Sequence, residues 1–116
     1  FEPEASPVYS GGPQGKHAII GIGPGFVTDN FKRSQENLDE IVTVSDADAF
    51  QYARLVAAKE GLLVGPTSGA AVSVMAQLAQ RTEFEGKTIV SFLYDTGERY
   101  LTTPGLFTDQ GIEYVD

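Results

Sequence analysis

The regular alternation of short apolar segments with stretches of helical periodicity most constrains the fold of this chain. Residues 41–44, 62–64 and 88–93 are aliphatic or β-branched runs of the kind that form buried strands. The two intervals between these runs repeat apolar residues at helical spacing. We therefore predict an α/β fold with a three-layer, open and mostly parallel sheet and flanking helices. Such sheets bind ligands at the loops beyond the carboxyl ends of their strands.

Capping signals locate the two predicted helices. Ser45 follows the first apolar run as an N-cap, and acidic residues stand in the first turn, where they favour the helix dipole. Gly61 supplies the C-terminal stop of this helix. The second helix is predicted to run from about residue 68 to residue 81, with one apolar face.

Alternating glycines mark the first candidate site. Residues 21–25 read Gly-Ile-Gly-Pro-Gly, which lets the backbone approach a ligand closely and adopt positive φ. The segment is not the dinucleotide-binding fingerprint, because that motif needs a glycine where Phe26 stands and a helix that opens there. A ligand-binding loop and a purely structural turn are both compatible with this pattern.

The turn before the second helix is the second candidate site. It spans residues 65–69 and places two hydroxyls, those of Thr67 and Ser68, at a helix N-terminus. Taken alone, the turn favours capping of exposed N–H groups as the role of these hydroxyls. The functional interpretation is that one hydroxyl faces a ligand atom, and a neutral donor suits a ring nitrogen because it does not force that nitrogen to be protonated. Thr67 is the candidate for this contact.

The other polar residues give no catalytic constellation. His17, alone in a glycine-rich loop, is interpreted as an incidental polar residue rather than a general base. Glu98 and Arg99 are interpreted as parts of a capped and salt-bridged turn. No Ser/His/Asp arrangement or carboxylate pair can be argued from spacing, so no catalytic residue is assigned. With no cysteine and one histidine, the sequence also supports no metal site.

Charge and hydropathy exclude two classes of partner. Sixteen acidic and eight basic side chains give a net charge of −8, which repels phosphate backbones and argues against nucleic-acid binding. The apolar runs are shorter than a membrane span, and no signal segment opens the chain. We therefore expect no membrane association and a cytoplasmic location.

Four motifs occur in a fixed order along the chain. They are Glu-Pro-Glu-Ala-Ser-Pro-Val at residues 2–8, Gly-Ile-Gly-Pro-Gly-Phe at 21–26, the turn at 65–71, and Gly-Glu-Arg-Tyr-Leu-Thr-Thr at 97–103. In this order they resemble the C-terminal part of the cysteine synthase (O-acetylserine sulfhydrylase) family, to which cystathionine β-synthase is closely related. Each motif is weak alone, but the four together are specific. The resemblance covers residues 2–107 and about the last third of such an enzyme.

The resemblance implies a fold, a cofactor and a reaction. The fold is part of the large domain of a pyridoxal-phosphate (PLP) enzyme of fold type II, and the reaction is β-replacement. In this reaction O-acetylserine loses its β-leaving group and sulfide adds, which yields L-cysteine. By the same resemblance Thr67 hydrogen-bonds the pyridine nitrogen of pyridoxal 5'-phosphate, and Gly21, Ile22 and Gly23 approach the substrate. The family also implies a homodimer and, as a further partner, serine acetyltransferase.

Two departures from the family pattern leave the substrates open. Ile20 stands where glutamine is usual, and Tyr94 stands where proline is usual. Both positions are expected near the site, so a cystathionine β-synthase-like enzyme that uses serine or homocysteine is an alternative. A non-catalytic α/β module that binds a partner protein is the alternative from another class.

The same resemblance implies that residues 1–116 are an incomplete domain, the C-terminal segment of a PLP-dependent β-replacement enzyme. The family's Schiff-base lysine, its asparagine-containing substrate loop and its glycine-rich phosphate loop all lie upstream of the matched motifs. The chain's own lysines, Lys16, Lys32, Lys59 and Lys87, do not lie in the motif that carries the Schiff-base lysine. We therefore expect this chain to be inactive by itself.

Overall fold

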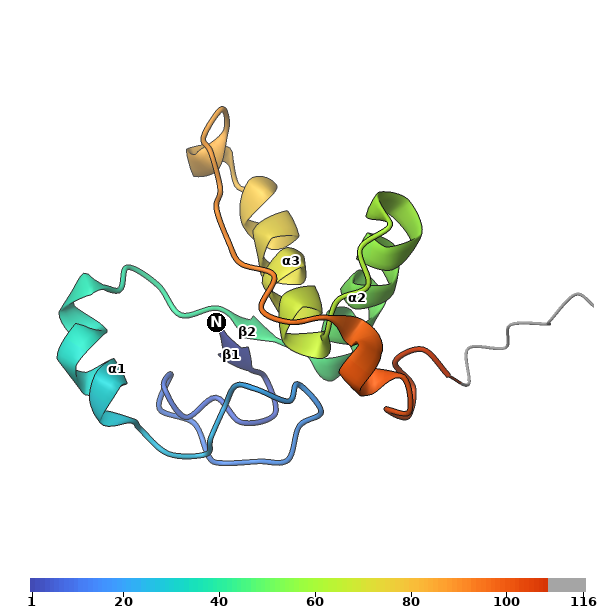
Figure 1. The fold of residues 1–116 in the computed structure, drawn as a ribbon. Coiled ribbons are helices and arrows are strands. Elements are labelled where there is room, and N and C mark those ends of the chain that lie inside the picture. The colour runs from blue at the N-terminus through green and yellow to red at the C-terminus, as the bar shows by residue number, and fades with distance from the viewer. Residues whose placement is uncertain (109–116) are drawn as a thin grey trace, which may run out of the picture.

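The computed structural model describes residues 1–108, and a short parallel sheet lies at its centre (Figure 1). Strand β1 (Glu2–Pro3) pairs with strand β2 (Thr43–Val44), and Glu2 lies opposite Thr43. Backbone hydrogen bonds from Glu2 N to the Val42 carbonyl and from Glu4 N to the Val44 carbonyl extend the pairing. The predicted α/β class and the parallel strand direction are confirmed.

Helix α2 (Asp46–Glu60) begins and ends where the capping signals place it. The Ser45 side chain accepts a hydrogen bond from Asp48 N at 3.1 Å, as an N-cap does. Gly61 ends the helix in the left-handed region, with φ of 70°, and its N–H bonds the Ala57 carbonyl. Local signals were therefore sufficient to predict both ends of this helix.

Helix α3 (Pro66–Ala79) begins two residues before the predicted start. Pro66 occupies the first helical position, where its missing N–H costs nothing, and Gly65 is the N-cap. The helix crosses α2 at Gly69, whose backbone lies directly against Ala49 and Ala53. Small side chains at this crossing allow a close approach of the two helices.

The core consists of two clusters of buried apolar side chains. One joins the sheet to α3 through Val44, Ala70 and Val74, and includes the fully buried Ile19. The other lies between α2 and the C-terminal segment, where Leu106 is fully buried. The first cluster anchors the segment that leads into the glycine loop, and so it positions the candidate site.

Helix α1 (Asp29–Ser34) lies apart from α2 and α3 (Figure 1). Thr28 caps it by accepting a hydrogen bond from Phe31 N. The ring of Phe31 stacks on that of Tyr9, with the ring centres 4.0 Å apart. A short 3₁₀ turn (Gln35–Asn37) follows and leads toward β2. The sequence did not predict this helix.

Two of the predicted strands are not strands in the described part of the chain. Residues 88–93 are extended but unpaired, and Val90 and Phe92 are 80% and 70% exposed. In residues 62–64 only Val64 is buried, and it makes a single antiparallel bridge with Thr96. An apolar run forms a strand only beside a neighbour with free backbone groups, and residues 1–108 supply none for 88–93.

The described residues contain two further 3₁₀ turns, Thr82–Phe84 and Gly97–Tyr100. Within residues 1–108 no helix is both long enough and apolar enough to cross a membrane.

Candidate functional site

The glycine loop and the N-terminus of α3 meet in an open pocket of about 320 Å³, a size that suits a small ligand. Its walls come from four separate parts of the chain. The lining residues are Phe1, Ile20, Gly21, Ile22, Thr67, Tyr94 and Asp95. Three of the four residues predicted for the site, Gly21, Ile22 and Thr67, therefore line one cavity.

Thr67 lies in the first turn of α3 and is 6% exposed. Its Oγ1 donates a hydrogen bond to the Ile20 carbonyl, at 2.8 Å. The hydroxyl thus joins the helix N-terminus to the start of the glycine loop. Its oxygen retains lone pairs that can accept a further hydrogen bond from a group in the pocket.

Ser68 makes a different connection. Its side chain is fully buried, and its Oγ accepts a hydrogen bond from Tyr94 N at 2.8 Å. The N-cap of α3 is Gly65, which has no side chain to cap the helix. The interpretation of Thr67 and Ser68 as caps was therefore wrong, because both hydroxyls bond segments far away in the sequence.

Gly21 shows why the loop needs glycine. Its φ is +117°, in the region that other residues rarely adopt. A Cβ at this position would lie only 3.0 Å from Thr67 Oγ1. The loop backbone therefore lies so close to the hydroxyl that a side chain here would press against it, and Gly21 keeps that side of the pocket open.

Gly23 is not among the residues that line the pocket. Its φ is +63°, and a Cβ there would meet Pro3 Cγ at 2.7 Å and His17 Nε2 at 2.8 Å. The carbonyl of Gly23 lies 3.0 Å from His17 Nε2 and accepts its hydrogen bond. Gly23 thus connects the loop to the strand β1 and to His17, behind the pocket wall.

His17 makes a defined hydrogen bond to the Gly23 carbonyl, which the sequence analysis did not predict. Its Nδ1 is buried and has no hydrogen-bond partner within residues 1–108, so Gly23 provides the only hydrogen bond of the ring there. The one sequence feature that could have indicated this contact is the position of the histidine, a few residues before the glycine loop.

Asp95 is a pocket residue that the sequence analysis did not assign. Its Oδ2 accepts a hydrogen bond from the Tyr100 hydroxyl at 2.5 Å. This bond, together with burial, raises the pKa of the Tyr100 phenol above its usual value. Asp95 Oδ1 is buried without a partner among the described residues, and a Cβ on Gly65 would lie 2.2 Å from it.

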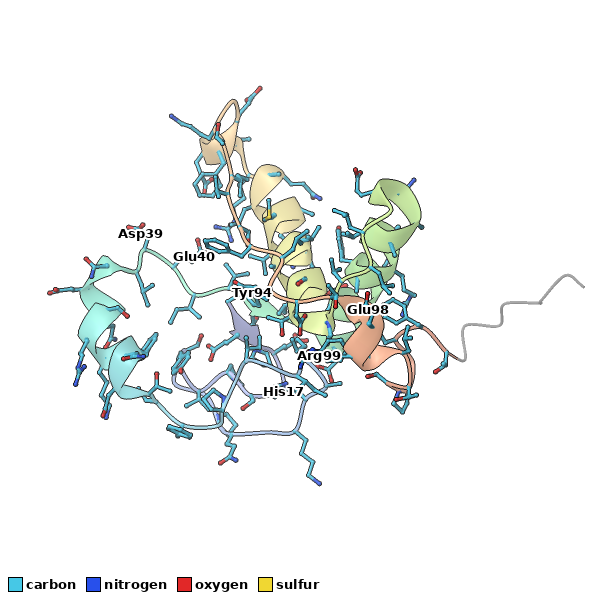
Figure 2. The ribbon with its side chains drawn as sticks, in the orientation of Figure 1. His17, Asp39, Glu40, Tyr94, Glu98 and Arg99 are labelled. Carbon is cyan, nitrogen blue, oxygen red and sulfur yellow. The ribbon has the colours of Figure 1, made fainter. Side chains whose placement is uncertain are left out.

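The two departures from the family pattern both lie in the pocket. Ile20 is 58% exposed and Tyr94 is 53% exposed. Figure 2 shows Tyr94 beside the base of α3, with Glu98 and Arg99 on the turn that follows it. Glu98 and Arg99 are exposed and do not line the pocket. Neither forms an ion pair within residues 1–108 and the 3₁₀ turn has no side-chain cap, so the prediction of a capped and salt-bridged turn was wrong.

The pocket suits the pyridine ring of the expected cofactor. Thr67 offers a neutral hydroxyl at the end of a helix, and Gly21 leaves space beside it that a side chain would fill. The lining includes no lysine, and no group of three or more potential metal ligands occurs within residues 1–108. The residues present can therefore hold one side of an aromatic ring, but they supply no amine for a covalent bond.

The fold and the pocket define a class of protein, an α/β protein with an open pocket where a glycine loop meets a helix N-terminus. The model of the family described as "Pyridoxal-phosphate dependent enzyme" matches residues 1–95. The chain belongs to this family.

Individual relatives agree with the family. The chain is 45% identical over 102 residues to a probable cysteine synthase of Bacillus subtilis. The structure superposes with a TM-score of 0.87 on O-acetyl serine sulfhydrylase isoform 3 from Entamoeba histolytica, at 46% identity over 99% of this chain. It superposes with a TM-score of 0.78 on an O-acetylserine dependent cystathionine beta-synthase from Helicobacter pylori, at 42% identity over 91% of this chain.

The chain spans about a third of the length of these relatives. The match to the Bacillus protein includes 88% of this chain but 32% of that protein. The matches to the two solved structures each include 33% of the solved chain. The likeness to a PLP fold type II enzyme therefore concerns one part of such a protein.

Proposed function

We propose that this chain is the C-terminal third of a PLP-dependent cysteine synthase that makes L-cysteine from O-acetylserine and sulfide. The observation that carries the proposal is the meeting of the Thr67 hydroxyl with the glycine loop in one pocket, where a Cβ on Gly21 would be 3.0 Å from Thr67 Oγ1. The likeness to a cysteine synthase and to an O-acetyl serine sulfhydrylase supports it.

Within this function Thr67 holds the ring nitrogen of the cofactor, and Gly21, Ile22 and Gly23 form the loop on the substrate side. When bound, the cofactor withdraws electrons from the amino-acid substrate, so that the β-substituent can leave and be replaced. The Thr67 hydroxyl has a single proton, which it gives to the Ile20 carbonyl in this structure, so it donates to the ring nitrogen only when it turns away from that carbonyl. As a neutral donor it favours elimination of a good leaving group over reactions that need a fully protonated ring. Thr67 thereby selects the type of reaction.

The remaining two-thirds of the complete enzyme would supply the Schiff-base lysine and the phosphate loop. The exposed segment of residues 88–93 supports this division of the site. Val90 and Phe92 are 80% and 70% exposed, which is high for large apolar side chains that follow one another along an extended segment. We propose that the rest of the complete protein pairs with this segment and covers it.

The test uses the complete protein. It should purify with the visible absorbance of bound pyridoxal phosphate, and it should form cysteine when O-acetylserine and sulfide are added. Thr67→Val, which removes the hydroxyl but keeps the shape, should weaken cofactor binding about tenfold, the value of one hydrogen bond of about 1.4 kcal/mol. Thr67→Ser is the matched control and should bind normally. A complete protein without cofactor would refute the proposal and favour the non-catalytic partner-binding module.

A second candidate is a cystathionine β-synthase-like enzyme that uses serine or homocysteine. The observation that favours it is the presence of Ile20 and Tyr94 in the pocket, where the family pattern has glutamine and proline. The likeness to an O-acetylserine dependent cystathionine beta-synthase is consistent with it. Competition between sulfide and homocysteine for the same donor separates the candidates, because the preferred acceptor is consumed first.

We further propose that the complete enzyme is a cytoplasmic homodimer that binds serine acetyltransferase. The family resemblance is the support for this assembly. Light scattering of the complete protein, alone and with the acetyltransferase, tests it by mass.

A further inference from the structure

We propose that His17 is a positioning residue for the candidate site, because its side chain holds the Gly23 carbonyl and so sets the shape of the loop that faces Thr67. This inference rests on the proposed function in one respect, the assignment of the loop to the substrate side. Its structural part stands on the contacts of His17 alone.

The backbone around His17 is fixed to the core of the protein. The next residue, Ala18, donates its N–H to Asp46 Oδ2 at 2.8 Å, at the start of α2. Ile19 is fully buried in the cluster that joins the sheet to α3. The N–H of Ile20 bonds the Ala18 carbonyl at 3.0 Å. His17 therefore projects from a rigid base.

The tip of the His17 side chain contacts the middle of the glycine loop. Nε2 lies 3.0 Å from the Gly23 carbonyl oxygen. A carbonyl can only accept, so Nε2 carries the hydrogen of this bond. The contact is tight, because a Cβ on Gly23 would be 2.8 Å from Nε2 and 2.7 Å from Pro3 Cγ. The ring and the strand β1 together leave Gly23 little freedom.

In this structure two hydrogen bonds thus hold the loop, one at each end of the segment that lines the pocket. Thr67 binds the carbonyl of Ile20 at 2.8 Å, and His17 binds that of Gly23 at 3.0 Å. Gly21 and Ile22, which line the pocket, lie between these two points. Without the second hold, the loop could turn about its glycines, while Thr67 would stay in place on α3. Loss of His17 should therefore affect the substrate more than the cofactor.

The experiment compares variants of the complete protein. His17→Phe keeps a ring and removes the donor, and it costs one hydrogen bond because Nδ1 has no partner within residues 1–108. His17→Gln keeps an N–H donor at a similar reach. Lys16→Ala changes an exposed neighbour and is the matched control. Gly23→Ala perturbs the same contact from the loop side.

Two readouts separate positioning from a general structural role. In protein labelled with ¹⁵N-glycine, the order parameters of Gly21 and Gly23 should fall from about 0.85 to below about 0.6 in His17→Phe. The KM for O-acetylserine should rise about fivefold to tenfold, as expected for one lost hydrogen bond, with kcat and the cofactor affinity unchanged. His17→Gln should restore both values, Gly23→Ala should resemble His17→Phe, and Lys16→Ala should match the wild type.

The proposal is overturned if the loop of His17→Phe is as ordered as that of the wild type, or if His17→Gln is impaired to the same extent. A fall in kcat at constant KM would overturn it as well. If the wild-type protein binds no cofactor or makes no cysteine, the proposed function fails. The order parameters of the same variants still decide whether His17 holds the loop.

Discussion

Replacing Gly69 with alanine should destabilise the protein, although alanine is the better helix former. Gly69 lies in α3 at its crossing with α2. A Cβ at this position would be 2.0 Å from the Ala49 carbonyl oxygen, 2.7 Å from Ala53 N and 2.8 Å from Ala53 Cβ. Two of these three atoms belong to the backbone of α2, so the helices themselves must move apart.

The size of the effect follows from two opposing contributions. Helix propensity favours alanine over glycine by about 1 kcal/mol in a helix interior. Against this, the new methyl group would be about 1.4 Å closer to the Ala49 oxygen than ordinary contact at 3.4 Å allows. Overpacking of this kind typically costs about 1–3 kcal/mol and sometimes more. Because two of the three atoms are backbone, the upper end of about 3 kcal/mol applies, and subtracting the propensity of about 1 kcal/mol leaves a net loss of about 2 kcal/mol.

Urea unfolding of the complete protein, followed by circular dichroism, measures this change. The control Gln77→Gly, at an exposed position of the same helix, should lose only the propensity of about 1 kcal/mol. The two contributions to the Gly69→Ala effect have opposite signs. A Gly69→Ala protein that is more stable than the wild type would therefore refute the close crossing of α2 and α3.

Two further predictions follow from ionisable pairs. The hydrogen bond to Asp95 raises the pKa of Tyr100, so its contribution is present below the usual phenol pKa of about 10 and is lost as pH rises through the raised value. Tyr100→Phe should cost about 1 kcal/mol at pH 7, and urea unfolding should show the difference disappear at strongly alkaline pH; a difference that is constant with pH would contradict this. Arg81 donates hydrogen bonds of 2.6 and 2.7 Å to Glu40 and so lowers the pKa of that carboxyl, and the interaction is lost as pH falls through the lowered value. An NMR titration of Glu40 should return to the usual range in Arg81→Gln, and an unchanged titration would remove the assigned cause.

Local signals in the sequence were sufficient where the structure depends on local chemistry. Helix α2 begins after Ser45 and ends before Gly61, where the capping rules place its two ends. The glycine loop and Thr67 lie together, as the resemblance to the family implies, although they are far apart in the sequence. The order of the four motifs was enough to bring these two segments to one site.

Other features depend on partners that no local pattern reveals. Residues 88–93 have the composition of a buried strand, but pairing needs a neighbour that the described residues do not contain. His17 contacts the Gly23 carbonyl and Asp95 contacts the Tyr100 hydroxyl, and the sequence analysis predicted neither contact. A single histidine or aspartate gives no sign of such contacts, because they arise from the path of the backbone rather than from spacing.

The central claim is that Thr67 contacts the ring nitrogen of pyridoxal phosphate, and a crystal structure of the complete protein with its cofactor tests it most directly. The account predicts that Thr67 Oγ1 lies within hydrogen-bonding distance, about 2.7–3.2 Å, of the ring nitrogen. It also predicts that Gly21 and Ile22 lie on the same side of the pocket as in this structure. A ring nitrogen that faces a charged side chain, or a cofactor bound away from Thr67, would contradict the account.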